Sequence, residues 1–206
     1  MVSGPPKTLV IACGALAREF LLVKRLNAWD HLTVACLSAS LHNRPQLIPE
    51  AVRAKIRAER DGYERVLCLY GDCGTGGLLD EVLKEEGVER IEGAHCYAFF
   101  LGLDEFDAVA EEEPATFFLT DYLVRHFETL IIKGLGIDRF PELLEMYFGN
   151  YRKVVYLAQV PDEALTRKAE RAAARLGLPL AVRYTGLGGL ERFLSPGSTE
   201  GAKRPS

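Results

Sequence analysis

RVLCLYGDCGTGGLLDEVLKEEG, residues 65–87, decides the fold class of this 206-residue chain. The apolar run over residues 65–70 predicts a buried strand, and the glycine-rich segment 71–77 predicts a turn. The amphipathic pattern that follows predicts a helix, which Gly87 ends in the left-handed conformation. A strand that leads through a tight turn into a helix is the repeating unit of α/β folds.

Similar apolar runs recur along the chain and are separated by helical patterns. The predicted strands cover residues 9–13, 32–37, 65–70, 88–92, 116–119, 154–158 and 180–184. Strands that alternate with helices predict an α/β fold with one open, mostly parallel sheet of about seven strands and helices on both faces. We expect a single domain over residues 1–194 and a disordered tail over residues 195–206, which are rich in Ser, Pro, Gly and charge.

Charge and hydropathy argue against several classes of partner. The chain has 25 basic and 29 acidic residues, and no block of basic residues predicts binding to nucleic acid. No stretch approaches the roughly 20 apolar residues that cross a bilayer, and residues 1–7 are too short and polar for a signal peptide. We therefore expect a cytoplasmic protein without a membrane partner, and the sequence leaves its oligomeric state open. Thiols are kept reduced in that compartment, so its five cysteines serve packing, metal binding or thiol chemistry.

Chemically active side chains follow the first four predicted strands, where open α/β sheets bind their ligands. In strand order these residues are Cys13, His42, Arg44, Asp72, Cys73, His95 and Cys96. We expect Cys13, Cys73 and Cys96 to converge on one crevice. Cys36 and Cys68 fall inside strands, where a free thiol behaves as a small hydrophobic group.

Three converging thiols allow several functions. Together with His95 or His42, the thiols Cys13, Cys73 and Cys96 form a ligand set suited to zinc or to an iron–sulfur cluster. A metal-free alternative makes Cys73 a thiolate nucleophile, with Asp72 or His95 handling protons. The chain contains no Cys-x-x-Cys pair, so thiols that merely follow strands remain a further alternative.

The glycine-rich turn is a candidate for binding the anionic part of a small-molecule ligand. Amide groups at the start of a helix attract anions, and an arginine can clamp a carboxylate or phosphate. The candidate residues are Gly71, Gly74, Thr75, Gly76, Gly77 and Arg44. The turn also resembles the glycine motif of S-adenosylmethionine-dependent methyltransferases, although Tyr70 stands where those enzymes have an acidic residue and Asp72 where they have a glycine. A turn that needs glycine for backbone reasons alone is the simpler alternative.

Six motifs carry a resemblance that spans residues 10–194. They are IACGALARE (11–19), LHNRP (41–45), YGDCGTGG (70–77), HCY (95–97), FFLTDYLVRHF (117–127) and YFGNY (147–151). By these motifs the chain resembles DUF1638, a bacterial and archaeal family of unknown function. Ala98 departs from the family pattern, in which an acidic residue follows His-Cys-Tyr.

The resemblance implies an association rather than an activity. It links the chain to corrinoid-dependent methyltransferases and their corrinoid proteins, and so to one-carbon metabolism, but it supplies no catalytic residue. The leading expectation is therefore a metal-dependent or cluster-containing protein that supports corrinoid-linked methyl metabolism. A thiol-dependent or S-adenosylmethionine-dependent transferase, and a non-catalytic module that binds a small ligand or a corrinoid protein, stay open.

Overall fold

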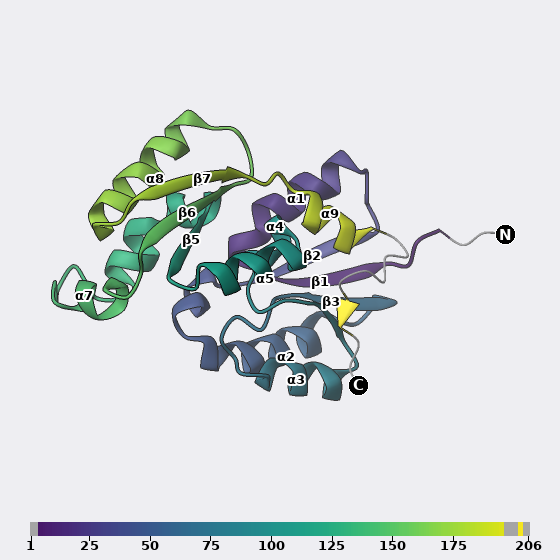
Figure 1. The fold of residues 1–206 in the computed structure, drawn as a ribbon. Helices are drawn as coiled ribbons and strands as arrows, with labels where there is room; N and C mark the ends of the chain where they lie inside the picture. Colours follow the sequence, from purple (N-terminus) through teal and green to yellow (C-terminus); the bar gives the residue numbers. More distant parts are fainter. Residues whose placement is uncertain (1–3, 196–201, 204–206) are drawn as a thin grey trace. The chain divides into compact units, whose positions relative to one another are not determined.

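The computed structural model describes residues 4–195 and 202–203 and divides the chain into two compact units (Figure 1). Unit 1 comprises Met1–Phe99 and Gly189–Ser206, and unit 2 comprises Phe100–Gly188. Each unit has its own parallel sheet, so the predicted α/β class is confirmed, with the seven predicted strands divided between two sheets. The single domain over residues 1–194 stays a prediction, and most of the predicted tail 195–206 lies outside the described residues.

The sheet of unit 1 has its four parallel strands in the order β2-β1-β3-β4. They are β1 (Thr8–Cys13), β2 (Leu32–Leu37), β3 (Arg65–Leu69) and β4 (Glu89–Ile91). All six residues of the inner strand β1 are buried, which explains its continuous apolar run. The two-residue strand β8 (Ala202–Lys203) pairs antiparallel with β4.

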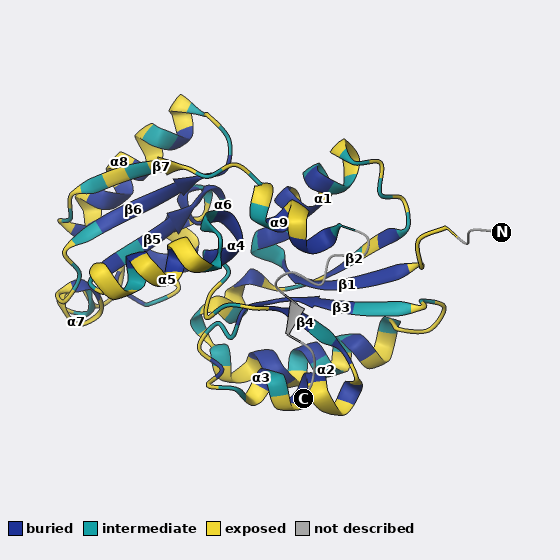
Figure 2. Ribbon diagram, turned by 45° about the vertical axis from the view of Figure 1, so that its right-hand side comes forward, coloured by how far each residue is buried: buried dark blue, intermediate teal, exposed yellow. Residues whose placement is uncertain are grey.

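Helices cover both faces of this sheet (Figure 2). On one face lie α1 (Ala17–Leu26) and α9 (Gly188–Leu194), and on the other lie α2 (Ile48–Glu59) and α3 (Leu78–Glu86). Helix α3 buries Leu79, Val82 and Leu83, whose spacing of three and four residues places them on one side of the helix. Packing of these side chains against the sheet thus positions the start of α3, which directly follows the glycine-rich turn.

The chain leaves unit 1 after Phe99 and returns to it at Gly189. These two residues are in backbone contact, because a β-carbon added to Gly189 would lie 2.9 Å from the carbonyl carbon of Phe99 and closer still to its oxygen. The short helix α4 (Ala98–Leu101) spans the exit point. Glycine is therefore required at position 189 for close approach of the two backbone segments.

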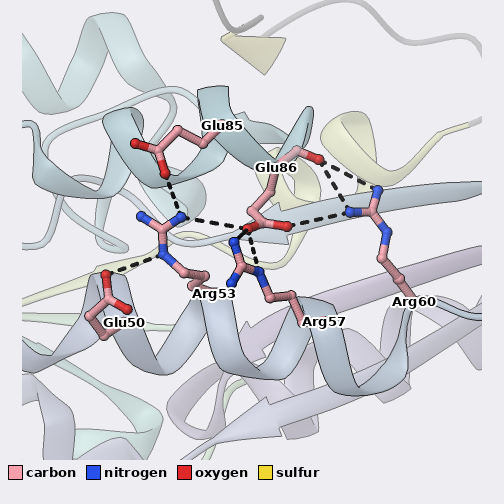
Figure 3. Close-up of polar contacts among 6 residues, drawn as sticks. All are labelled: Glu50, Arg53, Arg57, Arg60, Glu85 and Glu86. Atoms are coloured by element: carbon pink, nitrogen blue, oxygen red, sulfur yellow. Dashed lines mark hydrogen bonds and ion pairs between the residues drawn. The ribbon is translucent and has the colours of Figure 1, made fainter.

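A buried carboxylate joins α2 to α3 (Figure 3). The side chain of Glu86 is 6% exposed and lies among three arginines of the α2 segment. Its Oε1 is 2.7 Å from Nη2 of Arg57 and 3.6 Å from Nη1 of Arg53, and its Oε2 is 3.4 Å from Nη1 of Arg60. Arg53 also pairs with the exposed Glu85 at 2.5 Å. Glu86 is thus the carboxylate that forms ion pairs with all three guanidinium groups.

Replacement of Glu86 by glutamine is expected to lower the free energy of unfolding of unit 1 by about 2 kcal/mol, because hydrogen bonds to a buried charged group are lost. Glu85→Gln is the matched control and is expected to cost about 0.5 kcal/mol, because that carboxylate is exposed. Urea unfolding followed by the fluorescence of Trp29, the single tryptophan, measures both. Equal losses in the two variants would contradict the role given to Glu86.

Unit 2 has a three-stranded parallel sheet in the order β5-β6-β7. The strands are β5 (Thr116–Thr120), β6 (Lys153–Ala158) and β7 (Leu180–Tyr184). The helices are α5 (Leu103–Glu112), α6 (Asp121–Arg125), a π-helical segment (Glu128–Lys133), α7 (Leu143–Phe148) and α8 (Glu163–Leu176).

Two neighbouring phenylalanines of β5 show that both faces of the unit 2 sheet are covered. The ring of Phe118 packs on Phe106 of α5 at 5.5 Å between centroids, and the ring of Phe117 packs on Phe148 of α7 at 5.1 Å. Successive side chains of a strand point to opposite faces. Helices α5 and α7 therefore contribute to opposite faces of the sheet.

A closed set of polar contacts lies at the carboxyl ends of β5 and β6 in unit 2. Asp121 is 1% exposed, and its Oδ1 accepts hydrogen bonds from the Tyr156 hydroxyl (2.7 Å) and the Gln159 amide (3.1 Å). The Asp121 amide in turn donates to Oε1 of Gln159 (2.8 Å), and Arg125 lies 3.5 Å from Oδ2 of Asp121. These contacts tie the start of α6 to the end of β6.

No helix in the described part of the chain is both long and apolar enough to cross a membrane. The cytoplasmic location stays a prediction.

Candidate functional site

The ends of three adjacent strands bring cysteines together within unit 1. Cys13 is the last residue of β1, and the register that pairs Ala12 with Leu69 makes β1 and β3 end at the same level. Cys73 follows β3, and Cys96 follows the neighbouring strand β4. The Sγ atoms of Cys73 and Cys96 are 3.3 Å apart, and we call these two residues the thiol pair.

Backbone contacts hold the two loops of the thiol pair side by side. The amide of Asp72 donates to the carbonyl of Gly93 (3.0 Å), and the amide of Cys73 donates to the carbonyl of Ala94 (2.7 Å). A β-carbon on Gly71 would lie 2.9 Å from the Gly93 oxygen and 3.0 Å from the His95 carbonyl carbon. Glycine at position 71 is thus a steric requirement of the thiol pair.

Cys73 has an unusual backbone conformation. Its φ angle is +51°, in the left-handed region that residues with a β-carbon rarely adopt. Such conformations cost free energy and persist where surrounding contacts enforce them, often at functional sites. Here the hydrogen bond to the Ala94 carbonyl holds the Cys73 backbone, and its side chain meets Cys96.

The carboxylate of Asp72 occupies the inside of the glycine-rich turn. It accepts hydrogen bonds from the Thr75 hydroxyl (2.7 Å), the Gly77 amide (2.9 Å) and the Gly76 amide (3.1 Å). Burial raises the pKa of the Asp72 carboxyl, but these hydrogen bonds outweigh it, and the net pKa lies below the usual value. This favours a fixed negative charge over a proton carrier at Asp72.

The Asp72 carboxylate occupies the amides that the sequence predicted as an anion site. A carboxylate, a phosphate or S-adenosylmethionine would have to displace Asp72 from the amides of Gly76 and Gly77. The backbone of Gly74 packs against Pro45, because a β-carbon at Gly74 would lie 3.5 Å from Cβ of Pro45. Arg44, which precedes Pro45, is exposed.

The pKa values of the two thiols in the thiol pair shift in opposite directions. A hydrogen bond from the Cys96 thiol, supported by the backbone amides of Cys96 and Gly71, lowers the pKa of Cys73. The same hydrogen bond, together with burial, raises the pKa of Cys96. Cys73 is therefore the more acidic thiol of the pair, and Cys96 is the thiol that donates the hydrogen bond.

Cys13, the third thiol at this edge of the sheet, is less acidic than an ordinary cysteine. Burial raises the pKa of Cys13 to about 11, and a hydrogen bond from the Ala15 amide only partly opposes this. Tyr70 lies beside Cys13 and is 1% exposed, and burial raises the pKa of its hydroxyl as well. Among the described residues, no group gives this hydroxyl a hydrogen bond of normal geometry, since the neighbouring Cys13 sulfur is a weak acceptor.

The two candidate histidines are neutral neighbours at this edge. Desolvation by the surrounding chain lowers the pKa of His42 and of His95, although part of each ring is exposed. The charge of His95 further lowers the pKa of His42, whereas Asp72 partly opposes the shift at His95. Both imidazoles are unprotonated at neutral pH and can accept a proton.

The predicted metal ligands do not form a ligand set in their present conformations. Within residues 4–195 and 202–203, no three His, Cys, Asp or Glu side chains lie close enough to hold a metal ion. Of the two remaining cysteines, Cys68 is buried in β3 as predicted. Cys36 lies in the edge strand β2, but it is exposed, so the predicted role as a small hydrophobic group was wrong for this thiol.

Sequence reasoning missed two features of this edge. Tyr70 was placed in the predicted strand 65–70 and noted as a departure from the methyltransferase motif, but the burial of its hydroxyl beside Cys13 was not predicted. The donors to Asp72 were not predicted, although an aspartate that precedes Thr and Gly at such spacing favours a side-chain-capped turn.

A family model described as a protein of unknown function, DUF1638, matches residues 36–194. The chain belongs to this family. The matched segment contains His42, Cys73, His95 and Cys96, whereas Cys13 precedes it. No curated protein and no solved structure matches the chain. Membership in DUF1638 therefore identifies relatives without assigning an activity.

Proposed function

We propose that unit 1 is a thiol-dependent catalytic module in which Cys73 is the nucleophile. The observation that carries this proposal is the 3.3 Å contact between the sulfurs of Cys73 and Cys96. A thiolate, not a thiol, attacks electrophiles, and a donated hydrogen bond stabilises the thiolate at neutral pH. The half-buried position of Cys73 leaves it accessible to a small molecule.

Neighbouring groups have distinct roles under this proposal. Cys96 is a positioning residue whose S–H group keeps Cys73 ionised. The neutral imidazole of His95 accepts or returns a proton of the substrate. The substrate class is a small molecule with a soft electrophilic carbon or sulfur atom, since thiolates prefer such atoms. The link to corrinoid methyltransferase proteins stays a prediction, which a direct binding measurement tests.

Alkylation of the reduced chain with iodoacetamide over a range of pH values tests the nucleophile. Peptide mass spectrometry then gives the rate at each cysteine. Because the pKa of Cys73 is lowered, its thiolate persists to a lower pH, and its rate profile is expected to have a midpoint below that of an ordinary thiol. Cys68, which is fully buried, is expected to react far more slowly.

Two variants separate the hydrogen bond from simple packing. Cys96→Ala removes the donor and is expected to raise the midpoint for Cys73 and slow its alkylation several-fold at neutral pH. Cys96→Ser keeps a donor and is expected to preserve the low midpoint. A Cys73 that reacts no faster than Cys68 would overturn the proposal.

A metal centre is the second candidate, and the buried Tyr70 hydroxyl favours it. This hydroxyl lies beside Cys13, at the same sheet edge as the thiol pair, and makes no hydrogen bond of normal geometry among the described residues. Binding would require the thiols of Cys13, Cys73 and Cys96 to rearrange into a ligand set. They would hold zinc or an iron–sulfur cluster through thiolate ligands.

Elemental analysis and an absorption spectrum of anaerobically purified chain decide between the two candidates. A metal centre predicts roughly stoichiometric zinc or iron that is lost in Cys73→Ser. Metal-free protein whose Cys73 is readily alkylated contradicts the metal centre and supports the nucleophile.

A further inference from the structure

We propose that the thiol pair, Cys73 and Cys96, forms a reversible disulfide by exchange with small-molecule disulfides. This inference rests on the proposed function in one respect, since Cys73 must be the reactive thiol. It adds a second activity, a two-electron thiol–disulfide exchange at the same site. The sulfur contact of 3.3 Å within the pair is the starting observation.

The geometry of the two loops favours closure of this bond. A disulfide has an S–S length of about 2.05 Å, so the two sulfurs need to approach by roughly 1.3 Å. The Asp72–Gly93 and Cys73–Ala94 hydrogen bonds hold the two backbones together at Cys73 and at the residues that precede Cys96. These contacts keep the two loops side by side while the sulfurs approach.

Other cysteines of the site are poorer partners. Cys13 is the last residue of a fully buried strand, and its thiol lies against the Tyr70 side chain. Cys68 is buried within β3. Cys73 and Cys96 are both half-buried, which lets a small disulfide reach the pair. The structure therefore favours one pairing, Cys73 with Cys96.

The exchange proceeds in two steps, and each step conserves atoms and electrons. The Cys73 thiolate attacks one sulfur of a disulfide R–S–S–R, which forms a Cys73–S–S–R bond and releases R–S⁻; this anion takes up the proton that Cys73 had lost. Cys96 then loses its proton to water, attacks the Cys73 sulfur, and releases the second R–S⁻, which is protonated in turn. Two cysteine thiols are oxidised, and one R–S–S–R is reduced to two R–SH.

Incubation of the reduced full-length chain with oxidised glutathione tests the inference. After the remaining thiols are blocked with N-ethylmaleimide, peptide mass spectrometry is expected to find a Cys73–Cys96 cross-link and two glutathione molecules released per chain. Dithiothreitol is expected to restore both thiols. In Cys96→Ser the glutathione adduct of Cys73 cannot be resolved, and it is expected to accumulate to about one per chain. Cys36→Ser, which removes an exposed thiol of β2, is the matched control and is expected to form the same cross-link as the unaltered chain.

The outcomes separate this inference from the proposed function. A stable glutathione adduct on Cys73 in the unaltered chain, or a cross-link between any other two cysteines, would overturn the disulfide while leaving Cys73 as the nucleophile. If Cys73 resists both iodoacetamide and glutathione disulfide, both proposals fail together. A Cys73 that is readily alkylated by iodoacetamide but forms no cross-link to Cys96 would overturn the disulfide alone and leave the nucleophile standing.

Discussion

Asp121→Ala is expected to destabilise unit 2 by about 3 kcal/mol. The substitution leaves the Tyr156 hydroxyl and the Gln159 amide buried without their acceptor, and it removes the ion pair to Arg125. Each unsatisfied buried group costs about 1–3 kcal/mol, whereas the aspartate itself contributes little apolar packing. Hydrogen exchange at the amides of β6 is expected to accelerate about 100-fold, since each 1.4 kcal/mol corresponds to a factor of ten.

Asp162→Ala is the matched control for Asp121. Asp162 caps α8 of the same unit, where its Oδ1 accepts hydrogen bonds from the amides of Ala164 (2.9 Å) and Leu165 (3.1 Å). Loss of an N-cap side chain costs about 1 kcal/mol, so its effect on exchange at β6 is expected to be much smaller. Comparable effects of the two substitutions would show that Asp121 contributes no more than a helix-capping side chain does.

Gly71→Ala is expected to separate the thiol pair. The added methyl group would meet the Gly93 oxygen at 2.9 Å, and the His95 carbonyl carbon and Cα at 3.0 and 3.1 Å. All three atoms belong to the backbone and cannot rotate away, so the loop after β4 must move. We expect a loss of about 2 kcal/mol in the free energy of unfolding, as in overpacked cores. The iodoacetamide profile of Cys73 is expected to return to that of an ordinary thiol.

Gly76→Ala distinguishes this steric effect from strain in the turn. Gly76 has a φ angle of +64° and no atom within 4 Å of an added β-carbon. The substitution is expected to cost about 1 kcal/mol in backbone strain while it leaves the low pKa of Cys73 unchanged. Urea unfolding reported by Trp29, combined with alkylation of Cys73, measures both quantities. A Gly71→Ala chain with normal Cys73 reactivity would contradict the steric argument.

Strand positions follow from local sequence, whereas strand pairing does not. The apolar run 9–13 predicted β1 to within one residue, because a strand buried on both faces is mostly apolar. The division into two sheets depends on contacts between distant segments. The alternation of side chains along one strand does not specify those contacts. Helix α5 was not predicted, although Phe106 and Val109 lie three residues apart and are both buried.

The placement of the three cysteines at one sheet edge was predictable, whereas the contacts around them were not. The rule that ligands bind at the carboxyl ends of parallel strands placed Cys13, Cys73 and Cys96 at one edge, where they lie. The left-handed backbone of Cys73 and the hydrogen bonds that Asp72 accepts depend on local dihedral angles. A pattern of residue types does not specify those angles, and the sequence therefore favoured metal binding, with thiol chemistry as an alternative.

The contact between Phe99 and Gly189 makes residues 100–188 an insertion with adjoining ends. Insertions are tolerated where the entry and exit points of a host lie close together, because the host needs no rearrangement to accept them. The host in this chain keeps its four parallel strands, its thiols and its glycine-rich turn on residues that precede Phe99. Exchange of the segment at this junction would thus leave the thiols, the glycine-rich turn and the four parallel strands of the host unchanged in sequence.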